Sequence, residues 1–404
     1  MTGQDKNSLV ILASFIRPPG EAYGSEIRFL RTIKTLRELN TQIIPITNGR
    51  LVSKITNLVK ERYAVPLLSA RNSELSKRLL NYCYIIKTIT SIFIKPPKFD
   101  LILALDANLT DMLTSLLISQ FLRKPFVIMV NLAREDESHN LKDLPRLASE
   151  KGIVNAYLQI SSHLVKKFIA QRSALVVAVG LATKDQCIKC WQLSPSRILV
   201  TNNGPNVFVG EIRPIKEREI DVLYVGRFTK SKGVYLLPSI CAQLKESNPN
   251  IKMVAVGGSA KDIAAMKEKV LELSLLGNLE LREYQSSIQL GKIMENSKIF
   301  VNPSYRETFS MVTLEAMSAG CVCVISHIES LRRLYSGVSL FARAGDASDF
   351  ARVISSLLDS PNEMERISMR SREFSKLFDW DRIIKRELSV YKKIVYKNKK
   401  IIHK

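Results

Sequence analysis

The sequence lacks the features that define several large classes of protein. No stretch of its 404 residues is apolar over the ~20 residues that cross a bilayer. The first residues, MTGQDKNSLV, have neither the basic start nor the long apolar core of a signal peptide. Six cysteines are too few for a disulfide framework in a chain of this length. These absences predict a cytoplasmic protein, or one that is peripheral on the cytoplasmic face of a membrane.

Motifs for metal and dinucleotide chemistry are also missing. No D-x-D lies between a strand and a loop, where it would hold a divalent ion on a nucleotide sugar, so we expect no metal site and no cofactor. VGGSAKD lacks the third glycine of a dinucleotide fingerprint, which argues against a dehydrogenase. The lone C-x-x-C of Cys187 and Cys190 has no second pair or nearby histidine, so we expect it to pack in a helix.

Short apolar runs alternate with amphipathic segments along most of the chain. This alternation predicts an α/β protein with parallel sheets and helices on both faces. The length and a hydrophobic content of 46% fit two or three domains. The expected strands are residues 8–14, 42–46, 101–105, 126–130, 175–179, 197–201, 221–225, 251–256, 298–301 and 321–326.

The most informative stretch is NPSYRETFSMVTLEAMSAG, residues 302–320. It follows an apolar strand and begins as a loop, because proline cannot continue a ladder. Ser310 is a candidate cap of the next helix, which puts Glu307 in the loop and Glu315 about one and a half turns inside the helix. At ~1.5 Å per residue this spacing suits a ligand with a polar group at each end and a diphosphate facing the helix amides.

A second segment, DVLYVGRFTKSKG at residues 221–233, has a related arrangement. A short apolar strand leads into Gly226, which permits a tight turn and a close backbone approach. Arg227 then offers a planar fork for phosphate, and Lys232 offers a mobile point charge. Two cations at the carboxyl end of a strand predict a diphosphate clamp, although ordinary surface cations are the alternative.

In this order the segments resemble the retaining GT-B fold glycosyltransferases of family 4. The resemblance implies two Rossmann-like domains with a deep inter-domain cleft and a C-terminal crossover helix. It divides the chain into an acceptor-side domain, 1–205, and a nucleotide-sugar domain, 206–379, with the helix at 380–404 packing back on the first. The residues that carry it are 225–233, 254–259, 302–320 and 344–361, with 201–208 as the inter-domain segment and 378–394 as the closing helix.

The same resemblance implies a role for each candidate site residue. Arg227 and Lys232 grip the diphosphate, Glu307 contacts the sugar, and together they are the catalytic set. Glu315 binds the ribose hydroxyls, and Asn131 lies on the acceptor side. The other expected donor-binding residues are Gly24, Gly226, Phe309, Ser310, Met311 and Val312.

Four positions depart from the family pattern. Tyr23 replaces the first of two paired glycines, of which Gly24 is the second, and Asn131 stands where a histidine is common. Thr308 and Ser310 replace glycines on either side of Phe309, which restricts φ and predicts a different loop. These departures leave open a non-catalytic GT-B-like subunit that binds a partner or a membrane.

The charge is strongly basic and unevenly distributed. The formal net charge is +22, with ten lysines and arginines against two acids over residues 50–98 and nine against two over 381–404. Residues 81–99 interleave aromatics, isoleucines and lysines, which favours contact with an anionic membrane. A nucleic-acid binder is a further alternative that rests on charge alone and has no recognition motif.

The leading hypothesis is a retaining, metal-independent glycosyltransferase. It would move a sugar from a nucleoside-diphosphate sugar to an acceptor hydroxyl, in a hexosyltransferase-type reaction. By resemblance the acceptor is a lipid-linked or surface glycan, in cell-surface polysaccharide or protein N-glycan assembly. The expected partners are the nucleotide sugar, the glycan acceptor and an anionic membrane surface, and not nucleic acid.

Overall fold

The computed structural model divides the chain into two compact units. The first comprises Met1–Asn202 with Trp380–Lys404, and the second is Asn203–Asp379. The sequence-based division placed the first boundary three residues further on, after residue 205. The structure describes residues 9–15, 23–48, 51, 54–55, 57, 59, 63–65, 83, 86–87, 89–131, 144–207 and 209–402.

The first unit is built on a seven-stranded parallel sheet in the order β3-β2-β1-β4-β5-β6-β7. The interior strands β1, β4, β5 and β6 consist almost entirely of buried residues, since helices cover both faces. The strands are β1 Val10–Phe15, β2 Gln42–Asn48, β3 Tyr63–Val65, β4 Leu101–Ala104, β5 Phe126–Val130, β6 Leu175–Ala178 and β7 Ile198–Val200.

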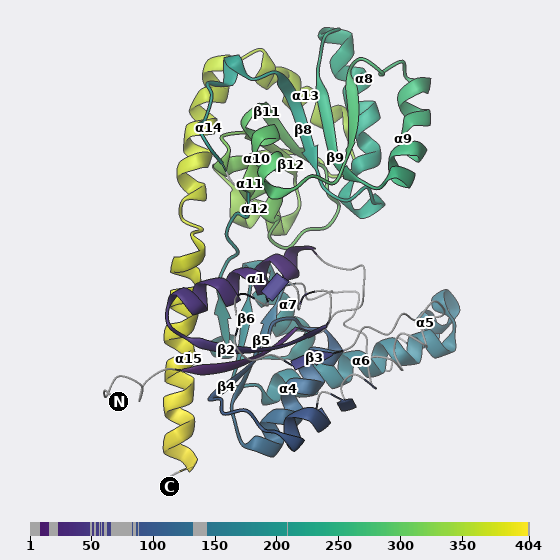
Figure 1. Ribbon diagram of the computed structural model, residues 1–404. Helices are drawn as coiled ribbons and strands as arrows, with labels where there is room; N and C mark the ends of the chain where they lie inside the picture. The colour runs from purple at the N-terminus through teal and green to yellow at the C-terminus, as the bar shows by residue number, and fades with distance from the viewer. Residues whose placement is uncertain are drawn as a thin grey trace. The chain divides into compact units, whose positions relative to one another are not determined.

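Helices flank this sheet on two sides. Figure 1 shows α1 on one face, with α4 and α6 on the other. Asn108 caps α4 by accepting from the Asp111 amide at 2.8 Å. The helices of this unit are α1 Tyr23–Glu38, α4 Leu109–Leu122, α5 Leu144–Lys151, α6 Ile153–Arg172, α7 Leu181–Trp191 and α15 Trp380–Ile402.

A buried polar cluster joins α15 to the rest of the first unit. Arg28 of α1 has no exposed surface and forms an ion pair with Glu387 of α15. Its guanidinium also donates to the carbonyl of Asn202 at 2.7 Å and lies 5.2 Å from the centre of the Trp380 ring. Arg28 therefore contacts both points at which the chain crosses between the units.

The second unit contains a six-stranded parallel sheet in the order β10-β9-β8-β11-β12-β13. Its core packs β8, β9, β11 and β12 against α8, α13 and α14 on one face. The strands are β8 Ile220–Val225, β9 Met253–Gly258, β10 Leu279–Glu283, β11 Ser297–Asn302, β12 Val322–Ser326 and β13 Leu340–Ala342. The helices are α8 Leu237–Ser247, α9 Ala260–Glu272, α10 Ser287–Glu295, α11 Met311–Ser318, α12 Glu329–Tyr335, α13 Ala347–Leu358 and α14 Pro361–Ser375.

The predicted α/β class and the ten expected strands are confirmed. Three strands were not expected, and all three lie at edges of the sheets: β3, β10 and β13. Interior parallel strands are buried on both faces and read as continuous apolar runs, whereas the edge strand β10 reads LELRE and carries charges.

Candidate active site

The candidate site lies where the strand order of the second sheet reverses. The strand β8 pairs with β9 on one side and with β11 on the other, so the loops after β8 and β11 leave neighbouring strands in opposite directions. Ligands of open α/β sheets bind outside the carboxyl ends of the strands at such a point. Both segments singled out in the sequence therefore meet at one edge of one sheet.

Close backbone contact holds these two loops together. Gly233 has φ of +68°, and a Cβ at this position would lie 2.0 Å from the carbonyl oxygen of Pro303. Only glycine fits this combination of positive φ and close approach. The amide of Tyr305 also donates to the carbonyl of Ser231 at 3.0 Å. The loops thus support each other through direct backbone contacts.

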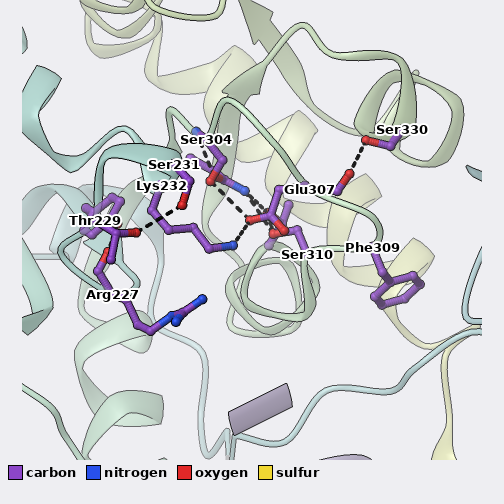
Figure 2. Close-up of polar contacts among 12 residues, drawn as sticks. Arg227, Thr229, Ser231, Lys232, Ser304, Glu307, Phe309, Ser310 and Ser330 are labelled. Carbon is purple, nitrogen blue, oxygen red and sulfur yellow. Dashed lines mark hydrogen bonds and ion pairs between the residues drawn. The ribbon is translucent and has the colours of Figure 1, made fainter. Parts of the chain in front are cut away.

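An ion pair between the two loops joins the predicted catalytic residues Lys232 and Glu307. Lys232 Nζ donates to Glu307 Oε1 at 2.6 Å, and Ser304 Oγ donates to the same oxygen at 3.1 Å. The side chains of Lys232 and Glu307 are 26% and 10% exposed, so the pair is partly desolvated but open on one side. Figure 2 shows the Glu307 carboxylate between the Lys232 ammonium and the Ser304 hydroxyl.

Arg227 lies on the same loop as Lys232 and is exposed. Figure 2 shows both side chains extending in the same direction. Within the described part of the chain no hydrogen bond or ion pair engages the Arg227 guanidinium, whereas its carbonyl accepts from the Tyr224 hydroxyl at 3.0 Å. Burial and the nearby Glu307 raise the pKa of Tyr224, so its hydroxyl stays protonated as a donor.

The Tyr224 side chain leaves little room for a side chain at Gly226. A Cβ at this position would lie 2.8 Å from the Tyr224 hydroxyl oxygen. From the sequence, Gly226 was expected to permit a tight turn and a close backbone approach. The structure adds that the space for a side chain at residue 226 is occupied by Tyr224, whose hydroxyl donates to the Arg227 carbonyl.

Ser310 immediately precedes α11, but it does not cap the helix as predicted. Its backbone is left-handed, with φ of +56° and ψ of +75°, and its side chain makes no capping bond. The hydroxyl lies 2.8 Å from the Thr313 hydroxyl and accepts from Asn302 Nδ2 at 2.9 Å. A capping serine adopts extended backbone geometry, so the left-handed turn turns this hydroxyl toward the buried Asn302.

Tyr335 fixes the backbone on both sides of this turn and was not found from the sequence. Its hydroxyl donates to the carbonyls of Phe309 and Ser310 at 2.9 and 3.1 Å. Complete burial raises the pKa of Tyr335, which keeps the proton in place. Phe309 is buried, with its ring 5.8 Å from that of Phe378. Any contact of Phe309 with a donor must therefore come from its backbone.

The first turn of α11 presents Met311 and Val312, both half-buried. Their amides belong to the first turn, where a helix supplies no acceptor of its own. Glu315 lies further along α11 and is buried, and its Oε1 accepts from the Asn206 amide at 3.0 Å. This contact was not predicted. It ties the segment that enters the second unit to the helix that carries the predicted donor-binding residues.

The candidate residues of the first unit lie near the carboxyl edge of its sheet. Gly24 is exposed in the first turn of α1, so it belongs to the helix rather than to the loop before it. Asn131 directly follows β5, and its Nδ2 donates to the carbonyl of Leu105 at 3.3 Å. Asp111 was not predicted from the sequence; it is a fully buried carboxylate that accepts from Ser14 Oγ at 2.7 Å, at the switch between β1 and β4.

The structure also bears on other features of the sequence. The described residues contain no group of three or more His, Cys, Asp or Glu side chains that could hold a metal. No helix in the described ranges is long and apolar enough to cross a membrane. Cys187 and Cys190 are buried in α7 as expected, and Cys321 and Cys323 are buried as well.

The comparisons with known proteins agree with this architecture. The fold matches that of Anabaena HepE in complex with UDP, with a TM-score of 0.73 at 15% identity over 95% of this chain and 99% of that one. Together with two parallel sheets and a switch-point site in the second, this match defines a GT-B fold. Residues 210–374 match the family model of the glycosyl transferases group 1. The similarity to that family therefore lies in the second unit.

Relatives found by sequence match a smaller share of the chain than the HepE structure does. A glycogen synthase of Mycobacterium tuberculosis is 26% identical over 252 residues, covering 59% of each protein. A GDP-mannose:cellobiosyl-diphosphopolyprenol alpha-mannosyltransferase of Xanthomonas oryzae is 25% identical over 245 residues, covering 58% of this chain and 64% of the relative. The match thus spans less than two thirds of the length of either relative.

Proposed function

We propose that the protein is a retaining glycosyltransferase that moves a sugar from a nucleoside-diphosphate sugar to an acceptor hydroxyl. The observation that carries this proposal is the Lys232–Glu307 pair, held at 2.6 Å across two loops at a switch point. Lysine has three donors, so Lys232 can retain Glu307 and still bind a phosphate oxygen. A donor would then place its diphosphate at Lys232 and its sugar beside Glu307.

The surrounding groups support the same orientation of the donor. Arg227 is exposed beside Lys232 and can add a second charge to the leaving diphosphate. The first amides of α11 favour an anion near Met311 and Val312. These groups supply the charge stabilisation that the reaction needs as the bond to phosphate breaks, so we propose that transfer proceeds without a metal ion.

The acceptor is proposed to be a lipid-linked or surface glycan, and the protein to act peripherally on the cytoplasmic face of a membrane. The name of the Xanthomonas relative specifies a diphosphopolyprenol acceptor for that protein. In this chain, Lys399 of α15 forms an ion pair with Asp100 at 2.9 Å, so the basic tail lies against the residue that follows segment 81–99. Cell-surface polysaccharide and protein N-glycan assembly both fit such an acceptor.

Substitution of the two glutamates tests the assignment. Glu307→Gln keeps the size of the side chain but removes the charge that favours a developing oxocarbenium ion, so turnover should fall far more than nucleotide affinity. Glu315→Gln should weaken nucleotide binding with a smaller effect on the bound complex. The measurements are calorimetric binding of UDP and GDP, and nucleotide release from a panel of donor sugars.

A non-catalytic GT-B-like subunit is the second candidate, favoured by one contact. Glu315 Oε1 is already used by the Asn206 amide, as expected of a structural carboxylate. If neither glutamine variant changes turnover or nucleotide binding, this candidate replaces the enzyme. Stabilisation by unrelated oligonucleotides with a steep salt dependence would instead indicate a nucleic-acid binder.

A further inference from the structure

The helix α6 exposes an unusual apolar stripe. On one side, Ala156 and Ile160 are buried and cluster with Leu147 of α5. On the other side, large apolar side chains recur at helical spacing and remain in solvent, with Tyr157 61% and Phe168 47% exposed. Contiguous apolar surface of this kind marks an interaction site. The stripe comprises Ile153, Val154, Tyr157, Leu164, Val165 and Phe168.

Neighbouring helices extend this surface. The helix α4 packs beside α6 and exposes Leu117 and Phe121. The Phe121 ring lies 4.6 Å from that of Phe93, which connects α4 to the segment 86–99. Ile94 of that segment is 79% exposed. Exposed apolar residues thus also occur on α4, which packs on α6, and on the segment that contacts α4.

The exposed charges of these segments are all positive. Residues 86–99, 109–124 and 153–172 contain eight lysines and arginines and one acid, Asp111, which is fully buried. The helix α6 itself has no acid, and Arg172 stacks on Phe168 with its guanidinium carbon 3.4 Å from the ring centre. Pairing of this face with a second copy would bring like charges together.

We propose that the α6 stripe, with the exposed apolar residues of α4 beside it, inserts into the interface of an anionic phospholipid bilayer. Exposed apolar side chains on segments where cations far outnumber acids suit such an interface, because the apolar groups enter the acyl boundary while the cations meet the lipid phosphates. The inference rests on the proposed action on a lipid-linked acceptor. Binding is measured without donor or acceptor, so loss of transferase activity and loss of binding are separate outcomes.

The test uses the full chain with vesicles of phosphatidylcholine mixed with phosphatidylglycerol, and with vesicles of phosphatidylcholine alone. The double variant Val165→Ser with Phe168→Ser should bind the anionic vesicles about tenfold more weakly, since two apolar side chains no longer enter the interface. A matched control, Leu276→Ser with Met369→Ser, removes two exposed apolar residues of the second unit and should bind as the unmodified protein does.

A tryptophan reporter gives a positive fluorescence signal on insertion, so the test does not rest only on a loss of binding that misfolding would also cause. Phe168→Trp should show a blue-shifted emission with anionic vesicles and quenching by brominated lipid, whereas Met369→Trp should show neither. Equal vesicle binding by the stripe variant and the unmodified protein would overturn the proposal. So would an equal loss in the control, or a lipid-free dimer that the stripe variant converts to a monomer, because α6 would then be an interface between copies.

Discussion

Removal of the Lys232 ammonium tests the site most directly. In Lys232→Ala the donor loses one preorganised charge, which for comparable groups costs ~2–4 kcal/mol of transition-state stabilisation. This corresponds to a fall in kcat/KM of roughly 30- to 900-fold. Arg227→Ala should cost a similar amount. The assay is initial-rate nucleotide release with the donor that the panel identifies.

The structure separates these two variants by a second measurement. Lys232 is hydrogen-bonded to the partly buried Glu307, whose remaining described partner for that oxygen is Ser304. Lys232→Ala should therefore lower the free energy of unfolding of the ligand-free protein by about 1 kcal/mol. Arg227 is exposed, so Arg227→Ala should stay within about 0.5 kcal/mol.

The matched control is Lys230→Ala, which removes an exposed cation from the same loop. It should retain near-normal turnover and stability. Near-normal turnover in both Arg227→Ala and Lys232→Ala would show that neither residue takes part in the reaction. A loss in Lys230→Ala as large as in Lys232→Ala would show that general loop charge, rather than the Lys232–Glu307 geometry, carries the effect.

Three further predictions concern other parts of the protein. Transfer should continue in EDTA, and abolition by EDTA with recovery on adding magnesium or manganese would contradict metal independence. Deletion of residues 395–404 should modestly weaken binding to anionic liposomes at low salt, because each cation near the surface contributes about 1 kcal/mol; equal binding to neutral liposomes would refute this. Alkylation of the native protein at mildly alkaline pH should modify the exposed Cys83 much faster than the buried thiols, since burial raises the pKa of Cys187, Cys241 and Cys321 to about 12. Mass spectrometry should show comparable labelling only after unfolding.

The sequence predicted what depends on local pattern and missed what depends on distant partners. The strands that lie inside the sheets were visible as apolar runs, and the two loops of the site followed from the ends of such runs. The fully buried Arg28 was not predicted, because arginine on a helix normally indicates an exposed face. Its partner Glu387 lies more than three hundred residues away, on a helix whose cations suggested a solvated surface. No local pattern reveals such a pair.

Ser310 shows how a serine can hold a backbone conformation that glycine adopts more readily. The residue stands where the resemblance implies a glycine, and its backbone is left-handed. That conformation costs a serine on the order of 1 kcal/mol. Three neighbours offset the cost: Asn302 donates to its hydroxyl, Thr313 shares a hydrogen bond with that hydroxyl, and Tyr335 donates to its carbonyl. Serine is thus tolerated at this position because its neighbours stabilise the turn that leads into α11.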